Sequence, residues 1–252
     1  MIKIENLETA GWDAAIRGMR NPKNSWDRSD SVINDKFYNT QYITDVSIGV
    51  NDKDLMSRLN KGGPVHAKYR RMIKVYCDIT APLYWWKEFD TYKVGTVANS
   101  CSTMHKLGEK EFELRDFSYE KLDCLKTISP DGEISMPWKS VFKDGTVDTS
   151  DLQVVDYNEM LWTPTGILEM TIEMLNKLRK LWLAGGKQDK SLWYQMIQLL
   201  PSSYNQRRTV ELNYEVLTGI YKWRKDHKLD EWREFCRFMK DELPESWIFM
   251  EE

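Results

Sequence analysis

The apolar positions in the last third of the chain recur at helical spacing. In a helix predicted over residues 165–184, one face carries Leu168, Ile172, Leu175, Leu178 and Trp182. Gly185-Gly186 follows this segment and would end the helix, because paired glycines favour a turn. Further helices are predicted over 189–200, 202–226 and 229–242. This part of the chain is therefore predicted to form a layer of helices.

The first half of the chain mixes two kinds of pattern. Alternation of apolar and polar residues predicts strands over 1–6, 73–79 and, at the end of a polar stretch, 42–50. Helical spacing predicts helices over 9–20, 52–60 and 82–89. Strands and loops in the N-terminal half, followed by a C-terminal layer of helices, indicate the α+β class.

Residues 106–160 show no clear apolar period. They contain two turn signals, Pro130-Asp131-Gly132 and Asp144-Gly145. The whole chain of 252 residues is long enough for one substantial domain. We therefore expect a single domain over 1–252 with an irregular segment at about 106–160 that is either a lid or an insertion.

Composition and charge exclude several kinds of protein. The net charge is -3 and the basic residues are spread along the chain, which argues against a nucleic-acid duplex as partner. No apolar run reaches the roughly 18 residues that cross a bilayer, and the first residues do not resemble a signal peptide, so we expect a cytoplasmic protein without a membrane span. Four cysteines without a CxxC pair and three histidines without HExxH argue against a metal centre. Eleven Trp and twelve Tyr favour a large core and subunit contacts, and therefore a homo-oligomer.

Two segments carry candidate chemistry. The first, over 85–105, begins with Trp85-Trp86 and passes through Gly95 into small and hydroxyl-bearing residues, an order that suits close approach of the backbone to a flat polar ligand. The second is the helix predicted over 202–226, on which Asn213 and Arg224 would share an inward face about 16 Å apart. A guanidinium on an inward face requires either an acidic side chain or a bound anion such as phosphate. The sequence leaves both partners open.

Several segments resemble the flavin-dependent thymidylate synthases. The stretch 91–104 lies where that family has Arg-His-Arg, then Ser, Ser and Arg-Tyr at fixed spacing. Asn213 and Arg224 follow a Leu-Pro pair as the family's Asn and Arg do. His227 to Trp232 is similar to the family's His-x-x-Trp-Glu, and Gly62 to His66 is similar to its Gly-His and Glu-His segment.

The signature itself departs from the family pattern. Thr91-Tyr92-Lys93 stands in place of Arg-His-Arg, so that one basic residue remains. Thr96 keeps the hydroxyl of the first serine, and the second serine falls on Cys101 with Ser102 beside it. Thr103 stands where the family has an arginine that binds the nucleotide phosphate. The family's manner of binding deoxyuridylate is therefore altered at this position.

The resemblance assigns roles to individual residues. Catalytic roles fall on Arg224, Cys101 and Ser102. Cofactor contacts fall on His66, Tyr92, Lys93, Thr96 and Asn213. Substrate contacts fall on Asn99, Ser100, Thr103, Arg207 and Arg224, with Arg208 as the alternative to Arg207 for a replacement charge. Each of four residues also has a purely structural alternative. Tyr92 would belong to the core and Lys93 would be a solvated surface charge. Cys101 would fill a small apolar space, and His66 would cap a helix.

The resemblance also implies a fold and a function. The expected fold is an antiparallel or mixed sheet with a C-terminal helical layer. The family reduces FAD with NADPH and transfers a one-carbon unit from methylenetetrahydrofolate to C5 of deoxyuridylate, as a homotetramer. The chain is thus expected to be a thymidylate synthase or a related pyrimidine nucleotide C5-transferase. The alternative is a homo-oligomeric nucleotide- or flavin-binding protein that kept the fold and lost the chemistry, and a third possibility is a protein that serves assembly only.

Overall fold

The computed structural model describes residues 2–38, 41–102, 108–122, 127–128, 134–135, 140–141, 147–148 and 164–250. The chain divides into two compact units. Unit 1 consists of Met1–Cys101 and Asn205–Glu252, and unit 2 consists of Ser102–Tyr204. The expected single domain with an insertion at about 106–160 stays a prediction, since most of that insertion lies outside the described residues.

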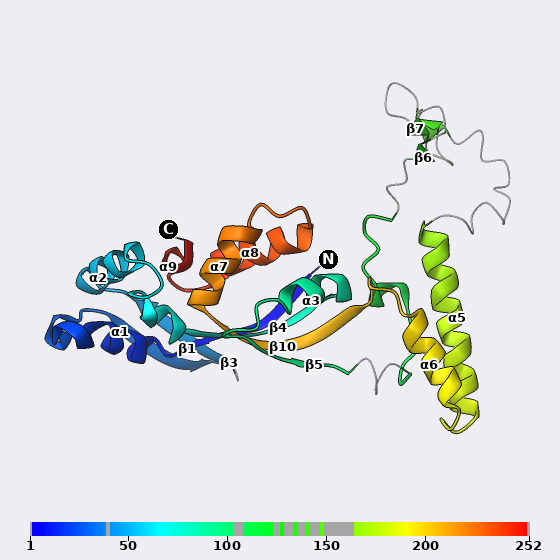
Figure 1. The fold of residues 1–252 in the computed structure, drawn as a ribbon, viewed down its shortest axis with the longest axis horizontal. Coiled ribbons are helices and arrows are strands. Elements are labelled where there is room, and N and C mark those ends of the chain that lie inside the picture. Colours follow the sequence, from blue (N-terminus) through cyan, green and yellow to red (C-terminus); the bar gives the residue numbers. More distant parts are fainter. Residues whose placement is uncertain are drawn as a thin grey trace. The chain divides into compact units, whose positions relative to one another are not determined.

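Unit 1 is built on a four-stranded antiparallel sheet (Figure 1). The strands, in the order in which they pair, are β1 (Lys3–Ala10), β4 (Lys74–Pro82), β10 (Asn205–Asn213) and β5 (Val97–Ser100). Along β4, Val75, Cys77, Ile79 and Ala81 are buried while the residues between them are more exposed. This alternation places one apolar face of the sheet against the core.

The helices of unit 1 enclose one core together with the apolar face of this sheet. They are α1 (Trp12–Arg20), α2 (Val50–Lys61), α3 (Leu83–Phe89), α7 (Tyr214–Arg224), α8 (Asp230–Glu242) and α9 (Trp247–Met250). In Figure 1, α3, α7 and α8 lie on one side of the strands. The core between helices and sheet is rich in aromatic rings, and its largest side chains include Trp12, Trp85, Trp86 and Trp232. Part of the tryptophan content is therefore explained by the interior of this unit.

The opposite face of the sheet is polar. Asp78 on β4 accepts hydrogen bonds from Thr209 and Arg207 of β10 and from Asn6 of β1. These bonds, led by the one from Thr209, lower the pKa of Asp78 to about 2. Three strands are thus cross-linked by one carboxylate on this face.

The remaining elements are short or belong to unit 2. In unit 1, β2 (Val32–Tyr38) and β3 (Gln41–Ser47) form an antiparallel pair, and the 3-10 turns are Asn21–Lys23, Trp26–Arg28 and Lys68–Arg71. Unit 2 contains α5 (Pro164–Ala184) and α6 (Lys190–Leu199), the 3-10 turn Leu114–Asp116 and the two-residue strands β6 (Thr127–Ile128), β7 (Ile134–Ser135), β8 (Ser140–Val141) and β9 (Val147–Asp148). Its core consists of Phe112, Phe117, Leu168, Leu175, Leu178 and Met196.

Most predicted elements are confirmed, and one important element is wrong. The predicted helices over 82–89, 165–184, 189–200 and 229–242 correspond to α3, α5, α6 and α8, and the α+β class is confirmed. The helix predicted over 202–226 is wrong, because Asn205–Asn213 is strand β10 and only Tyr214–Arg224 is helical. Pairing of β10 along its whole length with β4 outweighs the local helical spacing. Asn213 and Arg224 therefore do not lie on one continuous helix.

Candidate functional site

Arg224 is the centre of a group of five side chains, which we call the Tyr92 cluster: Glu88, Tyr92, Arg224, His227 and Trp232. Arg224 Nε donates a hydrogen bond to Tyr92 Oη at 3.0 Å, and Arg224 Nη1 lies 2.7 Å from Glu88 Oε2 and 2.8 Å from His227 Nε2. Trp232 Nε1 donates to the same Glu88 oxygen at 2.9 Å. The guanidinium carbon lies 4.8 Å from the centre of the Trp232 ring. The cluster joins the end of α3, the following turn, the end of α7 and the start of α8.

The charge of Arg224 is balanced within this cluster. Its side chain is 19% exposed and that of Glu88 is 35% exposed, so the pair lies at the edge of the core. Of the two partners that the sequence left open, the structure thus provides the acidic one. Glu88 was not among the predicted site residues, although it lies near the end of α3, four positions before Tyr92 in the following turn.

The turn that carries Tyr92 is fixed to the start of α7. Asn213 caps that helix through a hydrogen bond from Val216 N–H to its side-chain oxygen at 3.0 Å, and its amide nitrogen lies 3.4 Å from the Gly95 carbonyl oxygen. Thr96 donates its hydroxyl to the carbonyl oxygen of Tyr92. Gly95 has φ +82, and a Cβ there would lie 2.9 Å from the Asn213 amide nitrogen. Asn213 and Thr96 therefore hold the turn in shape, and only glycine suits its tightest position.

The polar residues after this turn lie on an exposed edge strand. All four residues of β5 are exposed, and Asn99 and Ser100 pair with Thr209 and Arg208 of β10. Cys101 is also exposed, and its N–H donates to the Arg207 carbonyl oxygen at 2.9 Å. Hydroxyl and amide groups are thus presented to solvent beside the turn.

The two neighbouring arginines of β10 lie on opposite sides of the sheet. Arg207 faces the polar side, where it lies 2.8 Å from Asp78. Arg208 lies on the helical side, with its guanidinium carbon 4.3 Å from the centre of the Trp86 ring and Nη1 2.7 Å from Asp90. Strand alternation explains the difference. Arg208, and not Arg207, is therefore on the same side of the sheet as α3 and α7.

Other predicted site residues do not join the Tyr92 cluster. His66 is exposed in the turn after α2, and Lys93 is exposed on the turn after α3. Ser102 begins unit 2, and Thr103 lies outside the described residues. Burial raises the pKa of Cys77 and of Cys236 to about 12, so both remain protonated thiols at neutral pH.

The part of the chain that the structure describes offers neither a metal cluster nor a membrane-spanning helix. No group of three or more His, Cys, Asp or Glu side chains there comes together to hold a metal ion. No described helix combines the length and apolar character that a membrane span requires.

Comparisons with solved structures find proteins of the same architecture. Thymidylate synthase X (ThyX) from Helicobacter pylori, solved with FAD and dUMP, matches with a TM-score of 0.57 and 16% identity over 99% of this chain and 97% of that one. The UMP/dUMP methylase PolB from Streptomyces cacaoi, bound with 5-Br dUMP, matches with a TM-score of 0.54 and 15% identity over 96% of this chain and 89% of that one. The chain has the fold of the flavin-dependent thymidylate synthases. No family model and no curated protein sequence matches it.

The predicted resemblance to flavin-dependent thymidylate synthases is thus confirmed for the fold, including the antiparallel sheet and the C-terminal helices. Within this fold, the turn after α3 contacts both ends of α7: Tyr92 meets Arg224 at its end, and Gly95 meets Asn213 at its start. The roles assigned to Tyr92, Thr96, Asn213 and Arg224 from the resemblance remain proposals.

Proposed function

We propose that this chain is a flavin-dependent enzyme that transfers a one-carbon unit to C5 of a pyrimidine nucleotide, as a thymidylate synthase or a close relative of one. The observation that supports this proposal is the shared fold with ThyX, solved with FAD and dUMP, and with the UMP/dUMP methylase PolB. The proposal includes NADPH and methylenetetrahydrofolate as co-substrates and a homotetramer as the working assembly.

Exposed donors near the Tyr92 cluster fit anionic and carbonyl-bearing ligands. Lys93 on the turn and Asn99 and Ser100 on β5 are exposed, and each offers N–H or O–H groups. These residues would hold the phosphates and ring edges of FAD and the nucleotide. FAD, when bound, would supply the hydride that completes the transferred methyl group. Arg224 fits less directly, because Glu88 already accepts from its guanidinium.

Tyr92 has the geometry of a hydrogen-bond donor to a ring carbonyl. Its oxygen accepts a hydrogen bond from Arg224 Nε at 3.0 Å, and the described residues include no acceptor for its own O–H. A positive donor on the oxygen strengthens the outward O–H as a donor. Tyr92 would therefore polarise a carbonyl of the pyrimidine or flavin ring, with Arg224 as its positioning residue.

The first experiment asks whether the purified protein binds both molecules. We expect FAD to be retained or taken up, visible as flavin absorbance, and dUMP or UMP to shift that spectrum. Product formation with NADPH and methylenetetrahydrofolate, and growth of a thymidine-requiring strain without thymidine, would support catalysis. A protein that takes up neither FAD nor a pyrimidine nucleotide would refute the proposal.

Cys101 provides a second test of the chemistry. Because Cys101 is exposed and stands where the family has serine, Cys101→Ser should leave nucleotide and flavin binding and turnover within about twofold of the original protein. Abolished turnover with unchanged binding would show that the thiol takes part in the reaction, contrary to this expectation.

A non-catalytic binding protein is the second candidate function. Two observations favour it: threonines occupy positions 91 and 103, where the resemblance leads us to expect arginines, and Arg224 is paired with Glu88. FAD and nucleotide binding without turnover, in soluble protein supplied with NADPH and methylenetetrahydrofolate, would select this function over the enzyme.

A further inference from the structure

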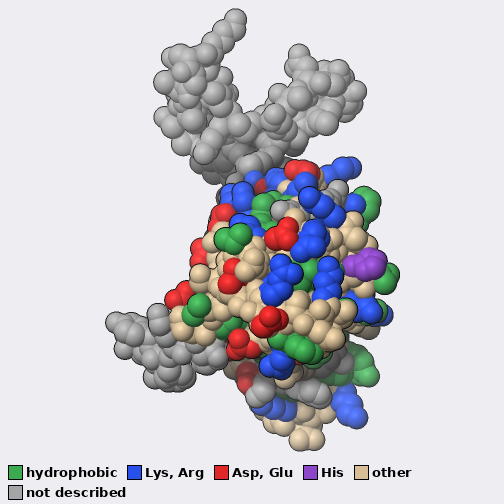
Figure 2. All heavy atoms as spheres, turned by 90° about the vertical axis from the view of Figure 1, so that its left-hand side faces the viewer, with side chains coloured by type: hydrophobic (Ala, Val, Ile, Leu, Met, Phe, Trp, Pro, Cys, Tyr) green, Lys and Arg blue, Asp and Glu red, His purple; other side chains and the backbone are tan. Residues whose placement is uncertain are grey.

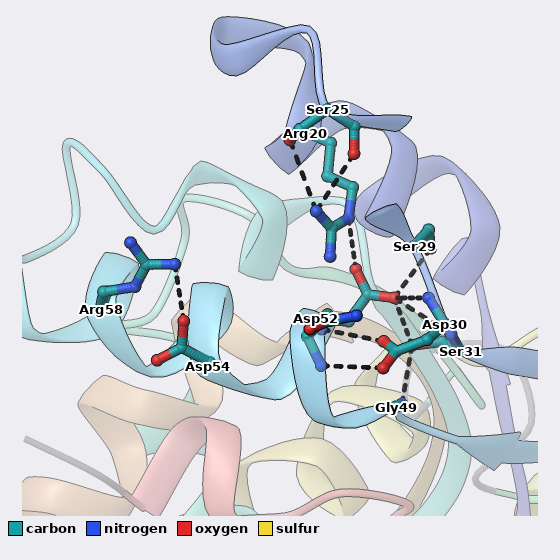
Figure 3. A network of polar contacts seen from close by, with 10 residues as sticks. Arg20, Ser25, Ser29, Asp30, Ser31, Gly49, Asp52, Asp54 and Arg58 are labelled. Carbon is teal, nitrogen blue, oxygen red and sulfur yellow. Dashed lines mark hydrogen bonds and ion pairs between the residues drawn. The ribbon is translucent and has the colours of Figure 1, made fainter. Parts of the chain in front are cut away.

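A buried carboxylate at the start of α2 organises the region between α1 and α2. Asp52 is 0% exposed, and Figure 3 shows the groups that converge on it. Its Oδ2 accepts from the hydroxyls of Ser29 and Ser31 at 2.8 and 2.7 Å and from the backbone N–H groups of Asp30 and Ser31 at 3.1 Å each. Burial by itself raises the pKa of Asp52, but hydrogen bonds from Ser31, Ser29 and Arg20 outweigh it and lower the pKa below its ordinary value. The carboxylate is therefore charged and fully satisfied.

Arg20 pairs with this carboxylate but is not itself satisfied. Arg20 is 3% exposed, and its Nε donates to Asp52 Oδ1 at 2.6 Å. Nη1 reaches the Ser25 carbonyl oxygen at 3.2 Å and the Ser25 hydroxyl at 3.4 Å (Figure 3). Nη2 is buried and has no hydrogen-bond partner in the described part of the chain. A buried charged donor without an acceptor costs about 1–3 kcal/mol or more, so an acceptor at this position would be stabilising.

Arg20 also lines a cavity that opens beside α1. The cavity has a volume of about 350 Å³, and its polar lining consists of Asp13, Arg17, Arg20, Trp26, Ser29 and Ser31. This volume falls within the range of small-molecule sites in proteins. Figure 2 shows Lys and Arg side chains interspersed with Asp and Glu side chains on the end of unit 1 that carries α1 and α2. We call this cavity the Arg17 pocket.

Two side chains of the Arg17 pocket, Trp26 and Arg17, are exposed. The Trp26 ring is 50% exposed, and its Nε1 donates to the Asn21 side-chain oxygen at 2.7 Å, which limits rotation of the ring. Arg17 is exposed, one turn before Arg20, and makes no ion pair or hydrogen bond with any residue that the structure describes. A fixed aromatic face and a nearby guanidinium are the elements that recognise a planar ring and an anion.

We propose that the Arg17 pocket binds a small molecule in which a planar ring is joined to a phosphate or carboxylate group. The anionic group contacts Arg17 beside the buried charge of Arg20, and the ring packs on Trp26. Asp13, which also lines the cavity, disfavours a bare anion and favours a ring that carries a hydrogen-bond donor. None of the lining residues belongs to the Tyr92 cluster, so this site is independent of the function proposed above.

Isothermal titration of the full-length protein with phenyl phosphate tests the site. This probe contains a ring and a phosphate but no nucleotide, and the Lys93→Gln variant separates binding here from phosphate binding at the Tyr92 turn. We expect measurable binding at low ionic strength, at least fivefold weaker for Arg17→Gln and for Trp26→Ala. Arg28→Gln is the matched control, because Arg28 is an exposed arginine of the same 3-10 turn as Trp26 but does not line the cavity; it should bind as the original protein does.

Three outcomes of these titrations would overturn the proposal. Absence of heat with phenyl phosphate at millimolar concentration overturns it. Equal affinity of the Arg17→Gln and Trp26→Ala variants with the original protein also overturns it, provided that their circular dichroism spectra are unchanged. Inorganic phosphate that binds as tightly as phenyl phosphate would show an anion site without a ring subsite, which contradicts the role given to Trp26. Lys93→Gln, at the Tyr92 turn, should have no effect on any of these affinities.

Discussion

Replacement of Arg224 separates a structural role from a binding role. In Arg224→Ala, the protein loses the hydrogen bond to Tyr92, the ion pair with Glu88 and the contact with the Trp232 ring. The hydrogen bond is worth about 1 kcal/mol. The ion pair, discounted because Glu88 is 35% exposed, is worth about 0.5–1 kcal/mol, and the ring contact about 0.5–1 kcal/mol. We therefore expect the free energy of unfolding to fall by about 2–3 kcal/mol.

Urea unfolding followed by circular dichroism measures this change, with Glu88→Gln as the partner in a double-mutant cycle. Glu88→Gln keeps an acceptor for Trp232 but removes the charge, and should cost about 1 kcal/mol. The coupling between positions 88 and 224 should be about 0.5–1 kcal/mol. A loss below about 0.5 kcal/mol for Arg224→Ala would refute the view that this network supports the fold.

We expect the same two variants to change nucleotide affinity in opposite directions. Arg224→Ala should weaken dUMP binding, because a guanidinium that can contact phosphate is gone. Glu88→Gln should tighten dUMP binding by about fivefold, because release of the competing carboxylate is worth about 1 kcal/mol. Unchanged affinity in both variants would show that Arg224 does not contact the nucleotide.

Three further changes test other parts of the structure. Asp52→Ala leaves the Arg20 charge buried without its carboxylate and should lower the free energy of unfolding by about 3–5 kcal/mol in urea titrations. Gly11→Ala should cost about 2 kcal/mol or more, because φ is +87 and a Cβ would lie 2.3 Å from a backbone oxygen, whereas Gly219→Ala in open space should stabilise α7 by about 0.5–1 kcal/mol. Hydrogen bonds from the Thr209 hydroxyl, the Arg207 guanidinium and the Asn6 amide lower the pKa of Asp78 from 3.8 to about 2. The contribution of Asp78 to the stability of the fold is therefore complete above pH 3.8 and is lost as the pH falls through about 2. In acid titrations, Asp78→Asn should remove about 1–2 kcal/mol of this pH dependence.

The sequence predicts well those helices whose buried residues recur at helical spacing within the helix itself. In α5, Leu168, Leu175 and Leu178 are buried at the spacing that the sequence pattern indicates. The strand β10 could not be found in the same way. The adjacent Arg207 and Arg208 leave its first half without an apolar alternation, and its strand conformation depends on pairing with β4, more than a hundred positions earlier. A local pattern contains no information about that partner.

The candidate site shows the same limit. The sequence indicates that Arg224 faces inward and needs an anionic partner, and the structure confirms both points. It does not identify Glu88, which lies 136 positions away in the chain. The placement of Asn213 within a continuous helix is wrong for a related reason: its side chain caps α7, a role that appears only once the helix is known to begin at Tyr214. The cofactor contact assigned to Asn213 stays a prediction.

Pairing of Arg224 with Glu88 does not by itself exclude a role in nucleotide binding. The pair lies at the edge of the core, where an ion pair contributes about 0.5–1 kcal/mol, and a phosphate near charge -2 is a stronger partner for a guanidinium than a single carboxylate is. Exchange of Glu88 for phosphate would then weaken binding only by about fivefold. Because Tyr92 accepts from Nε and Glu88 from Nη1, the exchange would leave Tyr92 in position. The same cluster can thus hold the turn in the free protein and remain available to a bound nucleotide.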